Sequence, residues 1–281
     1  MKNSYQTDSE TIYDHGKAVW SYFNKIITND IGDMKIPDWY EEYKDRILKN
    51  LPDKSIIEKY CIFHDCGKPL CETMIEGKRH FPGHEQASYD TWMSVTDVDE
   101  HTKAQIGNLI KHDMLFHTEK AEEILEKELS TSELCTLILS ALSALHANAD
   151  SFGGRDSDSF KIKFKNYSRR AKKVLEFIFP HEYVYVLVRE DLSPAQRAVQ
   201  SCHAVIEATR NFNMNGEHPS VIICGIKNEL TLKGQIEYLT SNKIKFSTFH
   251  EPDINFELTA IATAPISGDT RNLFKKYQLL K

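Results

Sequence analysis

The chain has 281 residues, enough for two domains that each bury a hydrophobic core. Hydrophobic residues make up 41% of the sequence and charged residues 27%, a composition typical of folded globular proteins and not of disordered ones. The formal charge of -6 argues against a general polyanion-binding protein. One local cluster of cations could still contact phosphate, and a solvated helix face is the alternative interpretation. Its members are Lys161, Lys163, Lys165, Arg169, Arg170, Lys172 and Lys173.

The N-terminal segment, residues 1–10, is polar and acidic and lacks the apolar centre of a signal peptide. No later apolar run approaches the ~18 residues that are needed to cross a bilayer. We therefore expect a cytoplasmic protein without a membrane partner. The six cysteines have no paired spacing and are expected to be free thiols, and the sequence does not indicate the oligomeric state.

The sequence predicts two domains of different secondary structure. Apolar residues recur at helical spacing from residue 10 to about residue 179, so a helical domain is expected over 1–179. At Pro180 the pattern changes to a β-prone run over 183–188, which opens a second domain over 180–281. That domain alternates predicted helices at 193–211 and 229–241 with predicted strands at 220–225, 244–250 and 258–263. The expected fold is multidomain, an all-α domain followed by a small α/β domain.

The strongest local signal in the first domain is the adjacent pair His64 and Asp65, at the end of an apolar helical run. Adjacent side chains on a helix diverge by about 100°, so both can point at one cation only near a helix end or irregularity. Gly67 and Pro69 supply such an end. The pair is therefore a candidate for two metal ligands.

Two residues from other predicted helices are further candidate ligands. His15 lies on the same helix face as Ile12 and Val19, where its side chain would point inward. Asp150 ends a helical stripe through Leu139, and an inward carboxylate needs a partner. Two histidines and two aspartates leave coordination positions open for water and substrate. This donor set suits a divalent ion such as Mn, Fe, Mg, Co, Ni or Zn.

Two more histidines, His84 and His112, fit the same pocket and together could hold a second ion bridged by Asp65. The alternative for each is a histidine that is hydrogen-bonded within the core. The remaining histidines of this domain are expected at the surface or, for the last one, beside the ligands rather than among them. They are His80, His101, His117 and His146.

The ordered residues His15, His64–Asp65 and Asp150 resemble the H…HD…D signature of the HD superfamily of metal-dependent phosphohydrolases. Gly67–Lys68 follows the pair as it does in many members of that family. The resemblance implies that the chain hydrolyses a phosphomonoester, a phosphoanhydride or a phosphodiester. It also implies one or two divalent metal ions as cofactors.

The residues near the pair have expected roles in that chemistry. The cation, held by Asp65, would activate a water molecule, and Lys68 would help to neutralise the phosphate oxygens. Glu85 or Asp113 would transfer a proton. For Lys68 the alternative is a lysine that faces solvent at a helix end.

Two stretches of the second domain, 186–204 and 249–260, resemble the type 2 peptidyl-tRNA hydrolase family. The resemblance implies a three-layer α/β sandwich with a mixed sheet. In an active member, the matching residues would position water and the terminal ester of a tRNA without a metal, with His203 and Asp253 nearest the chemistry. The matching residues are Gln200, Cys202, His203, Ala204, Asp253 and Thr259.

The second domain departs from that family in its basic residues. Arg197 is the only cation in 194–197, ahead of Gln200, and the sequence at 254–257 replaces a Gly-Arg-Thr-Gln segment. Both differences should weaken contact with a polyanionic RNA. A binding or regulatory use of the fold is therefore an open alternative to hydrolysis.

Three functions remain in competition on the sequence. The first is a phosphohydrolase that acts on a nucleotide or nucleic-acid phosphate, with the second domain recognising the substrate or an RNA. The second is an ester hydrolase acting on tRNA through the second domain. The third is a non-catalytic binding module with a structural metal. Chelation would abolish activity in the first case, spare it in the second and unfold the protein in the third.

Overall fold

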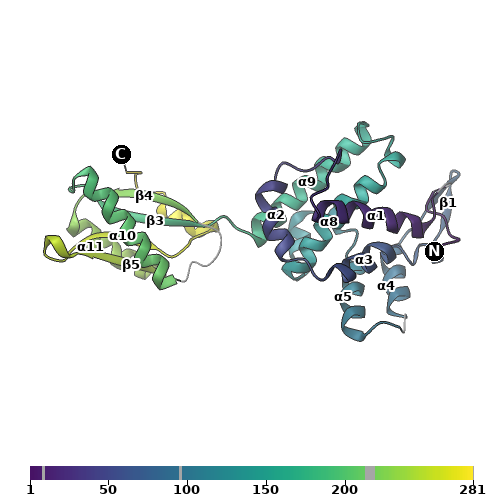
Figure 1. The fold of residues 1–281 in the computed structure, drawn as a ribbon, viewed down its shortest axis with the longest axis horizontal. Helices are drawn as coiled ribbons and strands as arrows, with labels where there is room; N and C mark the ends of the chain where they lie inside the picture. The colour runs from purple at the N-terminus through teal and green to yellow at the C-terminus, as the bar shows by residue number, and fades with distance from the viewer. Residues whose placement is uncertain (8–9, 95–96, 213–218, 281) are drawn as a thin grey trace. The chain divides into compact units, whose positions relative to one another are not determined.

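The computed structural model describes residues 1–7, 10–94, 97–212 and 219–280. It divides the chain into two compact units, Met1–Phe179 and Pro180–Lys281, and each has a hydrophobic core of its own. The first unit is helical and the second combines two long helices with a sheet (Figure 1). Among the described residues, no helix has the length and apolar character needed to cross a membrane.

The described part of the first unit contains nine α-helices. Their bounds are α1 Ile12–Ile27, α2 Tyr40–Lys49, α3 Lys54–Phe63, α4 His84–Met93, α5 Glu100–Lys111, α6 Leu115–Thr118, α7 Ala121–Leu125, α8 Thr131–Ala147 and α9 Asp158–Ile178. Two short 3₁₀ turns, η1 Lys68–Leu70 and η2 Asp150–Phe152, follow α3 and α8.

Helix α8 forms the centre of the first unit. Its first turn is fixed by a capping box, in which Ser130 Oγ accepts from the Glu133 N–H and the Glu133 carboxylate accepts from the Ser130 N–H at 2.8 Å. Every residue from Leu134 to His146 is buried, because the helix is apolar on nearly all sides. Helices α1 and α9 pack against it, and each contributes residues to the candidate site.

The first unit is not all-α, contrary to the prediction. Strands β1 (Thr73–Ile75) and β2 (Lys78–His80) form an antiparallel hairpin between η1 and α4. The turn residues Glu76 and Gly77 have φ values of 49° and 74°, the left-handed conformation that tight two-residue hairpins require. The helical periodicity did not reveal this hairpin because it is short and its first strand is exposed.

The second unit contains a mixed four-stranded sheet in the order β4-β3-β6-β5. Strand β3 pairs in parallel with β4 and antiparallel with β6, and β6 pairs antiparallel with β5. The predicted strands and helices of this region are all present. Their bounds are β3 Tyr183–Arg189, α10 Pro194–Phe212, β4 Ser220–Ile226, α11 Glu229–Ser241, β5 Phe246–Glu251 and β6 Glu257–Thr263; two 3₁₀ turns, η3 Pro252–Ile254 and η4 Gly268–Phe274, complete the unit.

The two helices cover opposite faces of this sheet. Along β3, Val184 and Val186 pack with Ala204 and Ala208 of α10. The alternate residues of β3, including Leu187, pack on the other face in the cluster that contains α11. This alternation follows from the period of two in a strand, and it gives a helix–sheet–helix arrangement.

Candidate metal centre

His64 and Asp65 lie immediately after α3, at the helix end that the sequence predicts. His64 is the residue that caps the helix, and Asp65 begins the turn that leads to η1. Both are buried, with 4% and 2% of their surface exposed. The Nδ1 of His64 donates to the Cys61 carbonyl at 2.8 Å, which directs Nε2 to within 3.1 Å of Asp65 Oδ2.

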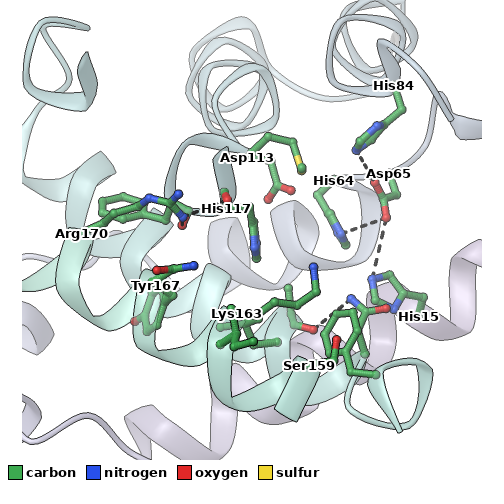
Figure 2. A pocket seen from close by; sticks show the side chains of 18 of the residues that line it. His15, His64, Asp65, His84, Asp113, His117, Ser159, Lys163, Tyr167 and Arg170 are labelled. Carbon is green, nitrogen blue, oxygen red and sulfur yellow. Dashed lines mark hydrogen bonds and ion pairs between the residues drawn. The ribbon is translucent and has the colours of Figure 1, made fainter. Parts of the chain in front are cut away.

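His15 reaches the same carboxylate from α1. The side chain of Thr11 caps the start of this helix by accepting from the Asp14 N–H, and His15 follows on the buried face. His15 is 1% exposed, and its Nε2 lies 3.8 Å from Asp65 Oδ2 (Figure 2). Ligand atoms of His15, His64 and Asp65 all lie within 4.8 Å of one another, so these residues can hold a metal ion.

The ionisation of these groups follows from their burial and their neighbours. Burial lowers the pKa of His15 to about 3, so this imidazole is neutral at pH 7. Burial also opposes the charged form of His64, but the Asp65 and Asp113 carboxylates outweigh it and raise the pKa of His64 to about 9. For Asp65, burial favours the neutral acid, yet His64 and Lys68 hold the pKa of this carboxyl well below its usual range.

The donor set fits a divalent ion. Two imidazoles and one carboxylate are ligands for the transition metals, and three ligands leave positions open for water and substrate. Among the described atoms, the buried Nδ1 of His15 has no hydrogen-bond partner. A single oxygen, Asp65 Oδ2, faces both His15 and His64 as well as a lysine. This carboxylate is therefore placed where a cation would be stabilised.

Lys68 is buried beside Asp65 and does not face solvent. It begins η1, is 8% exposed, and its Nζ donates to Asp65 Oδ2 at 2.6 Å and to Gln6 Oε1 at 2.9 Å. Glu10 is a second residue of the N-terminal segment at the site, with Oε2 3.8 Å from His15 Nδ1. The sequence did not indicate Gln6 or Glu10. Both lie before the first helix, where no hydrophobic period predicts which side chains point inward.

His84 lies on the other side of the Asp65 carboxylate. It is the first residue of α4, and its Nε2 lies 3.5 Å from Asp65 Oδ1, whereas Oδ2 faces His15 and His64. Gly67 makes this approach possible: a Cβ there would lie 2.2 Å from backbone atoms of Ala87 and Ser88 in α4. Glu85 contacts His84, with Oε2 3.4 Å from Nδ1, but it does not line the cavity described below.

Two predicted ligands are not brought into this group. His112 caps the end of α5, and its Nδ1 is bonded at 2.9 Å to the carbonyl of Asn108, in its own helix. Asp150 is exposed, because α8 ends at Ala147 and the chain turns into η2 before the aspartate is reached. The expectation that Asp150 continues a buried helical stripe is therefore wrong, and its role as a metal ligand stays a prediction.

A cavity of about 580 Å³ opens beside His15, His64, Asp65, Lys68 and His84. This is a usual size for a small-molecule site. Asp113 and His117 also line it, and Figure 2 shows both side chains beyond His64. The hydroxyl of Tyr60 donates to Asp113 at 2.5 Å. The prediction that His117 lies at the surface is wrong, because it lines this cavity, and burial lowers its pKa.

One face of α9 forms a wall of the same cavity and includes Lys163 and Arg170, two members of the cation cluster in the sequence. The sequence showed this cluster of cations, but a solvated helix face or linker was the favoured interpretation of it. Only the rotation of α9 about its axis decides which cations face the cavity.

In the second unit, four side chains converge from α10 and from strands β5 and β6. Gln200, 4% exposed, accepts from the Thr259 hydroxyl at 2.9 Å and donates to Glu251 at 2.5 Å. The Nδ1 of His203 lies 4.0 Å from the same Glu251 carboxylate. Cys202 and Asp253 are exposed, and it is Glu251 that lies beside Gln200.

No protein-family model matches the chain, and a search of curated proteins returns no match.

Proposed function

We propose that the first unit is a metal-dependent phosphohydrolase of the HD type that acts on a nucleotide or a nucleic-acid phosphate. The observation that carries this proposal is the convergence of His15 and His64 on the buried carboxylate of Asp65, at the wall of a cavity. A carboxylate and two imidazoles held in this way, beside open space for a ligand, are the parts that metal-assisted hydrolysis needs.

His15, His64 and Asp65 would hold one divalent ion, and His84 with Asp65 Oδ1 would begin a second site. A bound ion would lower the pKa of a water molecule and place positive charge at the phosphate oxygens. His64 must give up its proton on loading, because its pKa is about 9 beside two carboxylates. The Nδ1 hydrogen bond from His64 to Cys61 keeps Nε2 directed at the site throughout.

The other side chains at the cavity would orient the reaction and move protons. Lys68 fixes the Asp65 carboxylate through a 2.6 Å hydrogen bond and adds positive charge beside it. Asp113 and His117 line the cavity next to the group and are the candidates for proton transfer. Glu85 does not line the cavity, so it is a weaker candidate for proton transfer.

The test is phosphate release from nucleoside mono-, di- and triphosphates, cyclic nucleotides and end-phosphorylated oligonucleotides. The metal-stripped protein is supplied with Mn, Mg, Co, Ni or Zn in turn. Asp65→Asn removes the charge at the centre of the site, and Asp90→Asn, at an exposed position on α4, is the matched control. Metal-dependent release that is lost in Asp65→Asn and kept in Asp90→Asn supports the proposal. No release from any combination rejects it.

A second function is favoured by the cluster around Gln200 in the second unit. We propose that this unit has the fold of type 2 peptidyl-tRNA hydrolases and binds an RNA end or hydrolyses its ester. Its support is the hydrogen-bonded series Thr259, Gln200 and Glu251, with His203 at its exposed end. Hydrolysis of a peptidyl-tRNA that survives chelation and is lost in His203→Ala would establish it. Hydrolysis that stops on chelation would assign the activity to the first unit.

A further inference from the structure

Helix α9 presents one continuous face to the cavity. Its lining residues follow the spacing of a helix face: Ser159, Ile162, Lys163, Asn166, Tyr167 and Arg170. With a rise of 1.5 Å per residue, this face extends ~16 Å from Ser159 to Arg170. Figure 2 shows Ser159 near His15 and Arg170 at the opposite side of the cavity. The cavity is therefore longer than a single phosphate bound at the His15, His64 and Asp65 group would need.

Arg170 is held in place at this far end by the backbone of α6. Its Nη1 donates to the carbonyls of Phe116 at 3.1 Å and His117 at 2.9 Å. These bonds fix the guanidinium and leave its other N–H groups available. No carboxylate of the described residues lies within ion-pairing distance of it. Burial, and then the neighbouring Arg169, lower the pKa of Arg170, and the Glu119 carboxylate, which forms no ion pair with it, acts in the opposite direction.

Lys163 is the second cation on this face, and it also lacks an ion-pair partner among the described residues. Its Nζ lies 4.9 Å from the centre of the Phe152 ring. Two lysines further along α9 differ in this respect, because Lys172 pairs with Glu176 at 3.9 Å and Lys173 with Glu122 at 3.0 Å. Lys163 and Arg170 thus line the cavity and have no ion-pair partner among the described residues.

The charges along the cavity are not balanced. The lining residues with carboxylates are Asp65, which bonds to Lys68, and Asp113, which accepts from Tyr60. Lys163, one turn from Ser159, and Arg170, at the side of the cavity opposite His15, are left without an ion-pair partner among the described residues. Cations that are prearranged on a cavity wall bind phosphates and carboxylates through charge-assisted hydrogen bonds.

We propose that Lys163 and Arg170 form an anion subsite, so that the substrate carries a second anionic group apart from the phosphate that is hydrolysed. This inference rests on the proposed phosphohydrolase function of the same cavity. The substrate class is a phosphate ester with a second phosphate or a carboxylate at the other end of its body. The two residues determine specificity and take no part in the chemical step.

The test compares substrates that differ in the second anion. A nucleoside 5′-monophosphate is paired with the corresponding 3′,5′-bisphosphate, and glucose 6-phosphate with 6-phosphogluconate. The wild-type protein should prefer the doubly anionic member of at least one pair, and the pair concerned distinguishes phosphate from carboxylate. Arg170→Gln and Lys163→Gln should each lower kcat/KM for that substrate by roughly 10- to 100-fold, mainly through KM. Their effect on kcat/KM for the singly anionic member should be much smaller. Lys173→Gln is the control.

Arg170→Lys, which keeps the charge, should retain part of the preference even if Arg170→Gln folds poorly. The proposal would be overturned if the variants lowered kcat/KM equally for both members of each pair. It would also be overturned if the wild-type protein did not prefer the doubly anionic member of any pair. Binding of the same compounds to Asp65→Asn separates this inference from the proposed function. Bisphosphate or phosphogluconate binding that weakens on adding Arg170→Gln supports the subsite even if no hydrolysis is detected. Binding that is indifferent to Arg170 rejects it even if hydrolysis occurs.

Discussion

The Nε2 of His15 lies 3.8 Å from Oδ2 of Asp65, although the two residues come from α1 and from the turn after α3. The next residue of α1 explains how the two helices come so close. A Cβ on Gly16 would lie 2.3 Å from the carbonyl oxygen of Ile62 in α3, so the two backbones are in direct contact there. The distance between these two candidate ligands therefore depends on a glycine.

Gly16→Ala is expected to weaken metal binding and stability together. The added methyl group must push α1 away from a rigid backbone carbonyl, which should cost about 2 kcal/mol or more in unfolding free energy. Chemical denaturation and Mn titration measure the two effects. Gly234→Ala in α11 is the control, because a Cβ there meets no atom within 4 Å, and it should be neutral or slightly stabilising. Unchanged metal binding in Gly16→Ala would contradict this account of the site.

Lys68→Gln is expected to separate metal binding from catalysis. The ammonium group donates to the same oxygen that faces His15 and His64, so its removal should leave metal affinity unchanged or increase it. Phosphate release should fall by roughly 10²-fold, because charge beside the reacting phosphate is lost. Titration calorimetry and initial rates give the two quantities. Lys59→Gln, at an exposed position in α3, serves as the control, and parallel loss of binding and rate would point to a structural role for Lys68.

Substitutions of His84 and His112 should affect metal binding differently, although the sequence predicts both as ligands of a second ion. His84→Gln removes the imidazole 3.5 Å from Asp65 Oδ1, so metal affinity should fall by roughly 10-fold or more, or one of two bound ions should be lost. His112→Gln removes a side chain that is bonded to the Asn108 carbonyl and should leave metal binding as it is. Metal analysis after gel filtration distinguishes the two variants. A larger effect from His112 would mean that the α5 terminus rearranges on loading.

His146 should make the first unit less stable in acid. Burial lowers the pKa of His146 below its ordinary value of 6.5, so the unfolded chain binds this proton more readily than the folded one. Its contribution to stability is complete above pH 6.5 and is lost as the pH falls toward the lower folded pKa. Each unit of pKa difference corresponds to about 1.4 kcal/mol.

His146→Gln keeps a donor for the Lys35 carbonyl, which His146 Nε2 contacts at 3.0 Å, and removes the titration. The variant should therefore lose less stability than the wild type between pH 7 and pH 5, as measured by urea denaturation at each pH. Parallel curves for the two proteins would show that His146 is not a source of the acid sensitivity.

Much of the fold follows from local patterns in the sequence. The helices of the first unit and the alternating strands and helices of the second are each encoded by a period of hydrophobic residues. The change of period at Pro180 lies where the second compact unit begins. The β1–β2 hairpin was missed because it is short and much of it is exposed, and such a hairpin leaves little trace in hydrophobicity.

The sequence by itself determined that His64 and Asp65 lie at a helix end and that His15 points into the core, because both facts depend on local geometry. Only the tertiary structure decided which of the remaining polar residues meet them. It brought in His84, His117, Gln6 and the α9 cations, and it left His112 and Asp150 outside. The physical reason is that a helix's rotation about its axis and the point at which it ends are fixed by packing against distant segments. If a helix is rotated by the angle of one residue, or ends one residue earlier, a side chain moves from the cavity to solvent.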